Sequence, residues 1–236
     1  MIDLHCHIIY DTDDGARTIE NSINILREAE AAGFKKICCT PHYIEPQYIK
    51  TKEENEAKLK IIKERLLEEN IDIELFLGNE VYVTDNMKDF IREGKISTIA
   101  DTGYVLVELP IMQKLLNADE MIENLIFAGY TVIMAHPERY IYAQKDLKYF
   151  DQFLERGVLL QGNYESLLGK YGRLAEKTLK KLLKEEKISL LSTDTHREGS
   201  TYTKMNKILK VLKHYAKNDY YDYVTEKCQE KILKNM

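Results

Sequence analysis

The sequence predicts an α/β fold of parallel strands and covering helices, most naturally closed into a barrel. Seven short apolar runs rich in β-branched residues recur along the chain, and amphipathic helical patterns separate them. The runs are almost continuously apolar, as in parallel strands buried on both faces. The length of 236 residues suits one barrel, and no linker divides the chain. We therefore expect a single domain over residues 1–236, with an open doubly wound sheet as the alternative.

The predicted strands are spread from the first residues to position 191. They are Ile2–Cys6, Lys36–Thr40, Ile73–Gly78, Tyr104–Leu109, Thr131–Ala135, Val158–Gln161 and Ile188–Leu191. The predicted helices are Ile19–Ala32, Lys52–Glu69, Ala118–Ala128, Leu147–Arg156, Arg173–Glu186 and Tyr202–Lys217. We expect Gly33 and Gly129 to end helices, and Asn117 with Glu120 to form a capping box.

Charge and composition exclude several classes of protein. The formal net charge of -5 argues against a general nucleic-acid binder, which would need lysine and arginine to neutralise phosphates. The longest charge-free apolar stretch, Asn124–Pro137, is too short to span a bilayer. The first residues do not resemble a signal peptide. We therefore expect a cytoplasmic protein without membrane insertion.

The four cysteines do not support cysteine-based phosphatase chemistry. Such an enzyme needs a Cys-x5-Arg phosphate loop, and no arginine stands at the required position after any of the four. The cysteines are Cys6, Cys38, Cys39 and Cys228, and the sixth residues after them are Thr12, Ile44, Glu45 and Lys234. We expect the thiols to act as small buried apolar groups. No dinucleotide or P-loop motif follows a strand either.

Polar side chains of the metal-binding types stand at the carboxyl end of one predicted strand after another. They occur in His5 and His7, Thr40-Pro41-His42, Gly78-Asn79-Glu80, Glu108-Leu109-Pro110, His136-Pro137-Glu138-Arg139, Asn163 and Asp194-Thr195-His196. Five of the six histidines belong to this set, and only His214 does not. In a parallel barrel these strand ends share one face, so the side chains should converge.

The chemistry of this set predicts a cluster of divalent cations. Imidazoles mixed with carboxylates suit zinc, manganese or iron, whereas magnesium and calcium prefer oxygen ligands alone. Five histidines and at least four carboxylates are too many for one ion. Two or three ions that share a bridging carboxylate form the arrangement that cleaves phosphate esters and amides.

The same residues form motifs that together resemble a known superfamily. The motifs are H-x-H, T-P-H-Y, G-x-E, V-E-L-P, A-H-P-E-R and S-T-D-x-H, and they run from His5 to His196. They resemble the polymerase and histidinol phosphatase (PHP) superfamily. Within it, they are most similar to the manganese-dependent protein-tyrosine phosphatases of capsule and exopolysaccharide loci in Gram-positive bacteria. The segment GNYESLLGKYG, residues 162–172, extends this resemblance.

The resemblance implies a distorted, TIM-like (β/α)7 barrel with three divalent ions, manganese first and iron or zinc as alternatives. The implied ligands are His5, His7, Glu80 and Asp194 for one ion, Glu80 as a bridge with Glu108 and His136 for the second, and Asp14, His42 and His196 for the third. Arg139 would contact the phosphate, and Arg197 is either a second clamp or a surface charge. Asp11 and Asp13 receive no role beyond that of loop or capping residues.

The implied function is hydrolysis of phosphotyrosine by a metal-activated hydroxide, on a tyrosine autokinase that controls polysaccharide export. A phenol, with a pKa near 10, leaves more easily than a serine alkoxide. Tyr10, Tyr43 and Tyr48 are candidates to pack against the substrate ring. Three alternatives stay open: a small-molecule phosphatase such as histidinol-phosphate phosphatase, an amidohydrolase, and a domain in which the metals are only structural.

Overall fold

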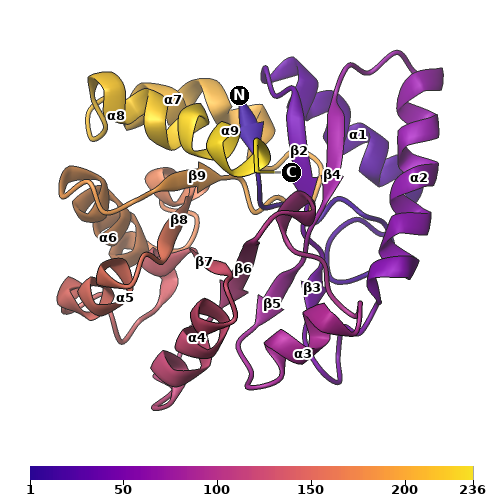
Figure 1. The fold of residues 1–236 in the computed structure, drawn as a ribbon. Helices are drawn as coiled ribbons and strands as arrows, with labels where there is room; N and C mark the ends of the chain where they lie inside the picture. The colour runs from indigo at the N-terminus through magenta and orange to yellow at the C-terminus, as the bar shows by residue number, and fades with distance from the viewer. Residues whose placement is uncertain (236) are drawn as a thin grey trace.

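The computed structural model describes residues 1–235 and shows a distorted barrel of parallel strands with helices on the outside (Figure 1). Hydrogen bonds join the strands in two sets, in the orders β1-β2-β4 and β3-β5-β6-β7-β8-β9. The strands are β1 Ile2–Asp3, β2 Lys36–Cys39, β3 His42–Tyr43, β4 Glu74–Leu77, β5 Glu80–Tyr82, β6 Tyr104–Glu108, β7 Thr131–Ala135, β8 Leu159–Asn163 and β9 Leu190–Ser192. All pairings within these sets are parallel, which confirms the predicted fold class.

Two of the predicted strands are each followed by a second short strand, β3 or β5, that was not predicted. Pro41, which has no N–H to donate to a ladder, separates β2 from β3, and Gly78 with Asn79 separates β4 from β5. Beyond these breaks, β3 and β5 pair with His42 directly opposite Glu80. The distortion thus places an imidazole and a carboxylate side by side at the mouth of the barrel.

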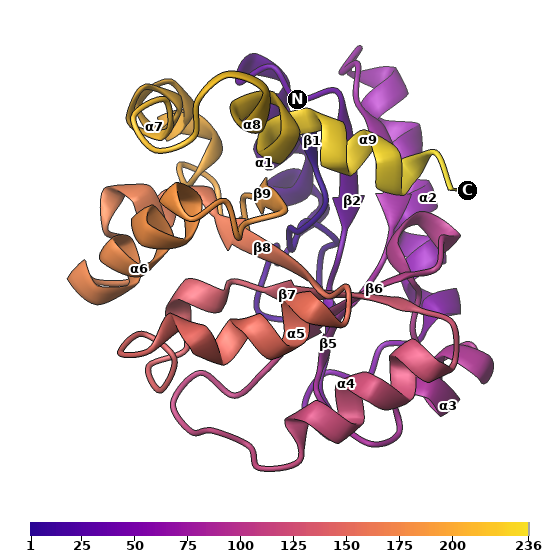
Figure 2. The same cartoon turned by 60° about the vertical axis from the view of Figure 1, so that its left-hand side comes forward.

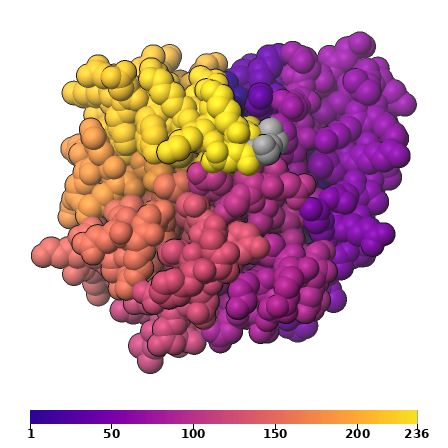
Figure 3. All heavy atoms as spheres, viewed as in Figure 1, coloured from indigo at the N-terminus to yellow at the C-terminus, as the bar shows by residue number. Residues whose placement is uncertain are grey.

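The barrel closes between the first and last strand segments. The amide of Asp194 donates a hydrogen bond to the carbonyl of His5 (2.8 Å), and the amide of His7 donates to the carbonyl of Thr195 (2.9 Å). Cys6 and Thr195 form a parallel bridge between these bonds. In Figure 3 the yellow C-terminal segment also lies against the indigo N-terminal segment.

The helices surround the strands (Figure 2). They are α1 Ile19–Ala31, α2 Lys52–Glu68, α3 Met87–Arg92, α4 Ala118–Phe127, α5 Asp151–Glu155, α6 Arg173–Lys184, α7 Met205–Leu212, α8 Asn218–Asp222 and α9 Cys228–Leu233. The six predicted helices are found, whereas α3, α8 and α9 were not predicted. Within residues 1–235, no helix has the length and apolar character needed to cross a membrane.

The helix ends follow the expected chemistry, with one exception. Gly33 and Gly129 stand one residue beyond the alanines that cap α1 and α4, with φ values of +89° and +92°, a conformation that glycine adopts easily. The capping box predicted at Asn117 is wrong, because its side chain makes no capping hydrogen bond. The boxes form instead at Thr18 of α1 and Thr51 of α2.

Apolar side chains fill the barrel below its polar mouth. One buried cluster includes Leu106, Ile133 and Leu190 from three strands, Leu4 directly after β1, and Ile232 of α9. The larger cluster lies between the strands and the surrounding helices. The apolar interior therefore leaves only the carboxyl ends of the strands for polar chemistry.

The loop after β1 folds back tightly onto His7, and this generates a stability prediction. A Cβ atom at Gly15 would lie 2.2 Å from the backbone oxygen of His7, so Gly15→Ala must displace the loop. We expect unfolding of the metal-free protein to become easier by about 1–3 kcal/mol. Gly103→Ala is the matched control, since a Cβ there has no neighbour within 4 Å. Equal denaturant midpoints for the two variants would contradict this prediction.

Candidate metal centre

The polar side chains at the strand ends meet around one pocket of about 370 Å³. The pocket is lined by Asp14, His42, Glu80, Glu108, Arg139, Lys170, Tyr171, Asp194, His196, Arg197 and Ser200. His5, His7 and His136 are buried and contact the carboxylates of this lining. The structure thus brings together all nine residues predicted to bind metal.

Four fully buried side chains form the deepest group. The Nε2 atoms of His5 and His7 lie 3.3 Å apart. Both nitrogens lie 3.1–3.2 Å from Oε2 of Glu80 and 3.4–3.5 Å from Oδ1 of Asp194. With neutral imidazoles the group has a charge of -2, which one divalent cation would balance. Oε2 of Glu80 has no hydrogen-bond partner within the described residues, so the donor set fits a cation.

Glu80 also links this group to a second one. Its Oε1 atom lies 2.9 Å from Nε2 of His136, which is 3.6 Å from Oε1 of Glu108. Its Oε2 atom lies 3.1 Å from Nδ1 of His42. Both oxygens of one carboxylate therefore face separate imidazoles, as expected of a bridging ligand.

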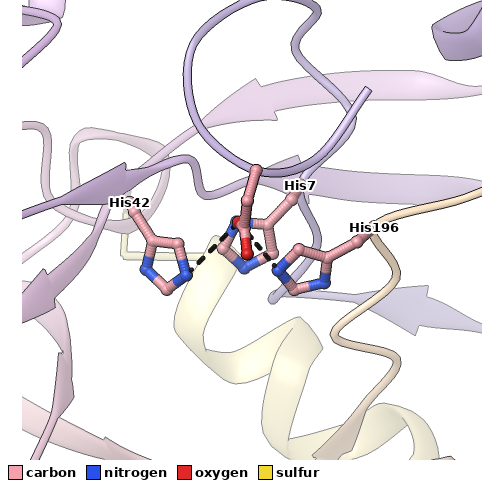
Figure 4. Close-up of side chains that lie close together, drawn as sticks. His7, His42 and His196 are labelled. Carbon is pink, nitrogen blue, oxygen red and sulfur yellow. Dashed lines mark ion pairs between the residues drawn. The ribbon is translucent and has the colours of Figure 1, made fainter. Parts of the chain in front are cut away.

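A third group lies nearer the solvent. Oδ1 of Asp14 is 3.3 Å from Nε2 of His196 and 3.7 Å from Nε2 of His42. Figure 4 shows His7, His42 and His196 gathered at this point, with dashed lines for the two ion pairs. The rings of His7 and His196 are stacked, with centroids 3.9 Å apart. Asp14 therefore reaches the site from the loop after β1, as the resemblance implied.

The electrostatics of the cluster favour added positive charge. Burial and the negative charge of Glu80 raise the pKa of Glu108 to about 8. Burial lowers the pKa of His5, but the carboxylates of Glu80 and Asp194 raise it more, to about 9. Burial and the nearby Arg139 lower the pKa of His136 to about 4, so its imidazole keeps a lone pair at neutral pH. Divalent cations would relieve the repulsion between these carboxylates.

Backbone strain also occurs within this cluster. His136 follows β7 with φ +33°, and Asp194 follows β9 with φ +51°. Neither residue is a glycine, and left-handed backbone in such residues is concentrated at functional sites. The turns aim both side chains into the pocket.

Asp13 orients His7, a role that the sequence did not reveal. Its Oδ2 atom lies 2.7 Å from Nδ1 of His7 and accepts a hydrogen bond from the amide of His42 (2.8 Å). Burial raises the pKa of Asp13, but the charge of His7 and these hydrogen bonds lower it to about 2. Because the carboxylate can only accept, Nδ1 of His7 carries a proton, so Nε2 is the nitrogen left to bind a cation once its own proton is lost.

Gln161 performs the same task for His5. Its Nε2 donates to the carbonyl of Gly162 and to Oδ1 of Asn163, which fixes the orientation of the amide. Its Oε1 then accepts from Nδ1 of His5 at 2.7 Å. The signal in the sequence was a glutamine at the end of an otherwise apolar strand, which the strand prediction contained but did not explain.

Arg139 stands between the cluster and the solvent. Its guanidinium donates to Oδ2 of Asp194 (3.2 Å) and lies 4.5 Å from the ring centroid of Tyr171. The same Oδ2 accepts from Asn163 (2.6 Å) and from the Tyr171 hydroxyl (3.3 Å). Arg197 is exposed at the pocket rim and makes no ion pair within residues 1–235.

The three tyrosines proposed for the substrate ring behave differently from one another. Tyr43 is buried against Phe90, so the proposal for this residue is wrong. Tyr48 stacks on His42 with ring centroids 5.8 Å apart. Tyr10 lies under the ammonium of Lys58. Tyr171, which we did not predict, supplies the aromatic wall of the pocket.

Comparison with known proteins assigns the chain to a family. The family model described as capsular polysaccharide synthesis, CpsB/CapC, matches residues 1–234. The chain belongs to the CpsB/CapC family. This membership confirms the resemblance that the motifs from His5 to His196 had indicated.

Individual relatives of this CpsB/CapC protein carry consistent names. CapC of Staphylococcus aureus is 29% identical over 196 residues, covering 83% of this chain and 77% of the relative. Tyrosine-protein phosphatase YwqE of Bacillus subtilis is 27% identical over the same coverage. A crystal structure from work on YwqE and on CpsB of Streptococcus pneumoniae, described as unique metal-dependent tyrosine phosphatases, is 26% identical. It superposes with a TM-score of 0.92 over 100% of this chain and 95% of that one.

The role of Asp13 generates a prediction about metal affinity. Asp13→Asn should weaken binding of Mn²⁺ by about 10–100-fold, because an amide no longer fixes the tautomer and angle of His7. Asp11→Asn is the matched control, since this carboxylate in the same loop pairs with Lys58 at the surface. Calorimetric titration of the metal-free proteins measures both affinities. An affinity for Asp13→Asn equal to that of the control would show that Asp13 has no orienting role.

Proposed function

We propose that this protein is a metal-dependent tyrosine-protein phosphatase of capsule or exopolysaccharide synthesis. The observation that carries the proposal is the cluster of nine histidine and carboxylate side chains beneath a pocket that presents Arg139. The family assignment and the names of its relatives support the same activity. Burial raises the pKa of the Cys6 and Cys38 thiols, so neither is a suitable nucleophile.

We propose that the cluster holds three divalent ions, manganese by preference. His5, His7, Glu80 and Asp194 would hold the first, Glu80, Glu108 and His136 the second, and Asp14, His42 and His196 the third. Among residues 1–235 one group of ligand atoms within 4.8 Å of one another matches the first set, and a second holds Asp14, His42 and His196 together with His7. A third group joins Glu80 and Glu108 to His42, while His136 contacts both carboxylates at 2.9 Å and 3.6 Å. Bound divalent cations supply Lewis-acid charge and lower the pKa of water to about 7.

The residues around the cluster would bind and orient the phosphate. Arg139 points its guanidinium into the pocket while Asp194 and the Tyr171 ring hold it in place, so it is arranged to pair with phosphate oxygens. Such fixed positive charge stabilises the transition state of phosphoryl transfer. Arg197 and Lys170 add positive charge at the rim. A phenol leaves without full protonation, so the site needs no strong general acid for phosphotyrosine.

We infer that the substrate is a tyrosine autokinase of polysaccharide export and that the protein acts in the cytoplasm. The family description supports the connection with capsule synthesis. The charge of -5 gives no general affinity for nucleic acid. The autokinase would present its phosphotyrosine to the pocket as part of a flexible segment.

A panel of substrates tests the function. Metal-stripped protein is resupplied with Mn²⁺, Zn²⁺ or Mg²⁺ and given a phosphotyrosyl peptide, a phosphoseryl peptide and histidinol phosphate. We expect turnover of the phosphotyrosyl peptide, highest with Mn²⁺, and a higher melting temperature with the activating ion. Turnover of histidinol phosphate alone would identify a small-molecule phosphatase instead. If the ions raise the melting temperature but none of the substrates is hydrolysed, the ions have only a structural role.

The two arginines at the pocket should contribute unequally. Arg139→Gln should lower kcat/KM for phosphotyrosine by about 10²–10³-fold, because it removes a charge fixed at the phosphate site. Arg197→Gln should have a smaller effect, since its exposed side chain has no fixing partner within residues 1–235. Metal content is measured in both variants, so that a loss of ions is not mistaken for a loss of the clamp. Equal losses would assign Arg197 the same role as Arg139.

A further inference from the structure

A second hollow adjoins the pocket. This apolar groove has a volume of about 470 Å³ and is lined chiefly by Ile111, Met112, Ile141, Tyr171 and Leu174, with Arg139 at one side. Arg139 and Tyr171 line both hollows, so their stacked pair is the wall between them. The groove and the pocket are thus neighbours at the mouth of the barrel, separated only by this pair.

The groove is built from loops on the same face as the metal cluster. Ile111 and Met112 follow β6, Ile141 follows β7, and Leu174 lies at the start of α6. The amide of Ile141 donates to the carbonyl of Ile111 (3.1 Å), which joins the first two loops. The walls of the groove are therefore held together by backbone contacts and not only by side chains.

The apolar side chains of the groove are unusually exposed. Met112 is 73% exposed, Leu174 65% and Ile141 42%. Single exposed apolar residues are common, but a group of them around one hollow marks a binding surface. Burying them against a partner would be favourable.

We propose that the groove binds an apolar side chain two positions from the phosphotyrosine in the substrate protein. The inference rests on the proposed function, because it takes the phosphotyrosine to be held in the adjoining pocket. Alternate residues in an extended segment point the same way and lie about 6–7 Å apart, so this side chain reaches across the Arg139–Tyr171 wall. Arg139 and Arg173 flank the groove and complement a segment made anionic by its phosphate.

The size of the groove favours this occupant over a second copy of the chain. A hollow of about 470 Å³ accommodates one or two side chains. A stable dimer interface buries about 800 Å² on each partner, far more than this groove offers. Self-association through the groove is therefore the less favoured occupancy, and the test below distinguishes it from peptide binding.

The test separates peptide recognition from chemistry. Leu174→Glu and Met112→Glu replace two exposed residues, so the fold should tolerate both. Phe127→Glu is the matched control, because Phe127 is 83% exposed at the end of α4, just before β7 begins at the opposite end of the barrel. The substrates are two phosphotyrosyl peptides, with leucine or serine two positions from the phosphotyrosine on either side, and p-nitrophenyl phosphate, which fills only the pocket.

We expect the wild-type protein to have a KM about tenfold lower for the leucine peptide than for the serine peptide. Leu174→Glu and Met112→Glu should abolish this difference and leave both kcat and the hydrolysis of p-nitrophenyl phosphate unchanged. Phe127→Glu should behave as wild type. This split between KM and kcat would not result from a general loss of folding.

Three results would overturn the proposal. The wild-type protein could show no preference between the peptides, or the variants could keep it. Sedimentation could instead show a wild-type dimer that Leu174→Glu converts to a monomer with unchanged KM, which would make the groove a surface for self-association. Failure of the proposed function looks different, because then wild-type protein hydrolyses neither phosphotyrosyl peptide while it still hydrolyses another phosphomonoester.

Discussion

The closure of the barrel between its first and last strand segments is the constraint on which the site depends. The hydrogen bonds that join His5 and His7 to Asp194 and Thr195 bring together residues almost two hundred positions apart. Alternate residues of a strand point the same way, so His5 and His7 face the centre while Cys6 between them is fully buried. The cluster is therefore a consequence of parallel pairing, and the loops only complete it.

Closure also concentrates negative charge, which the protein alone balances poorly. Glu80, Glu108 and Asp194 are buried close together, and Arg139 pairs with Asp194. Burial, together with the negative charge of Glu80, raises the pKa of Glu108. The left-handed backbone of His136 and Asp194 adds strain to the same place. The buried carboxylates and the strained backbone both destabilise the metal-free fold. Their presence at one place is therefore explained by cation binding and not by stability.

The sequence predicted which side chains meet in the cluster because their positions follow from the ends of the strands. His42, Glu80 and His136 each follow an apolar run, and pattern alone locates them. The residues behind the ligands were harder to predict. Asp13 and Asp14 are neighbours in the sequence, yet one orients His7 and the other faces His196, and only the path of the loop decides between them. The position of Tyr171 and the helices α8 and α9 depend on tertiary contacts that no local pattern encodes.

In this barrel the strand ends carry the groups for chemistry, and the loops carry the groups for substrate recognition. The strand ends supply the buried donor set, and its geometry is fixed by the ladder and by Asp13 and Gln161. The loops after β6, β7 and β8 supply Met112, Arg139 and Tyr171, which line the pocket or the apolar groove. Loops tolerate substitution better than paired strands, so substrate preference can change while the cluster stays intact. Arg139 links the two levels, because it pairs with Asp194 of the cluster and also forms a wall of the apolar groove.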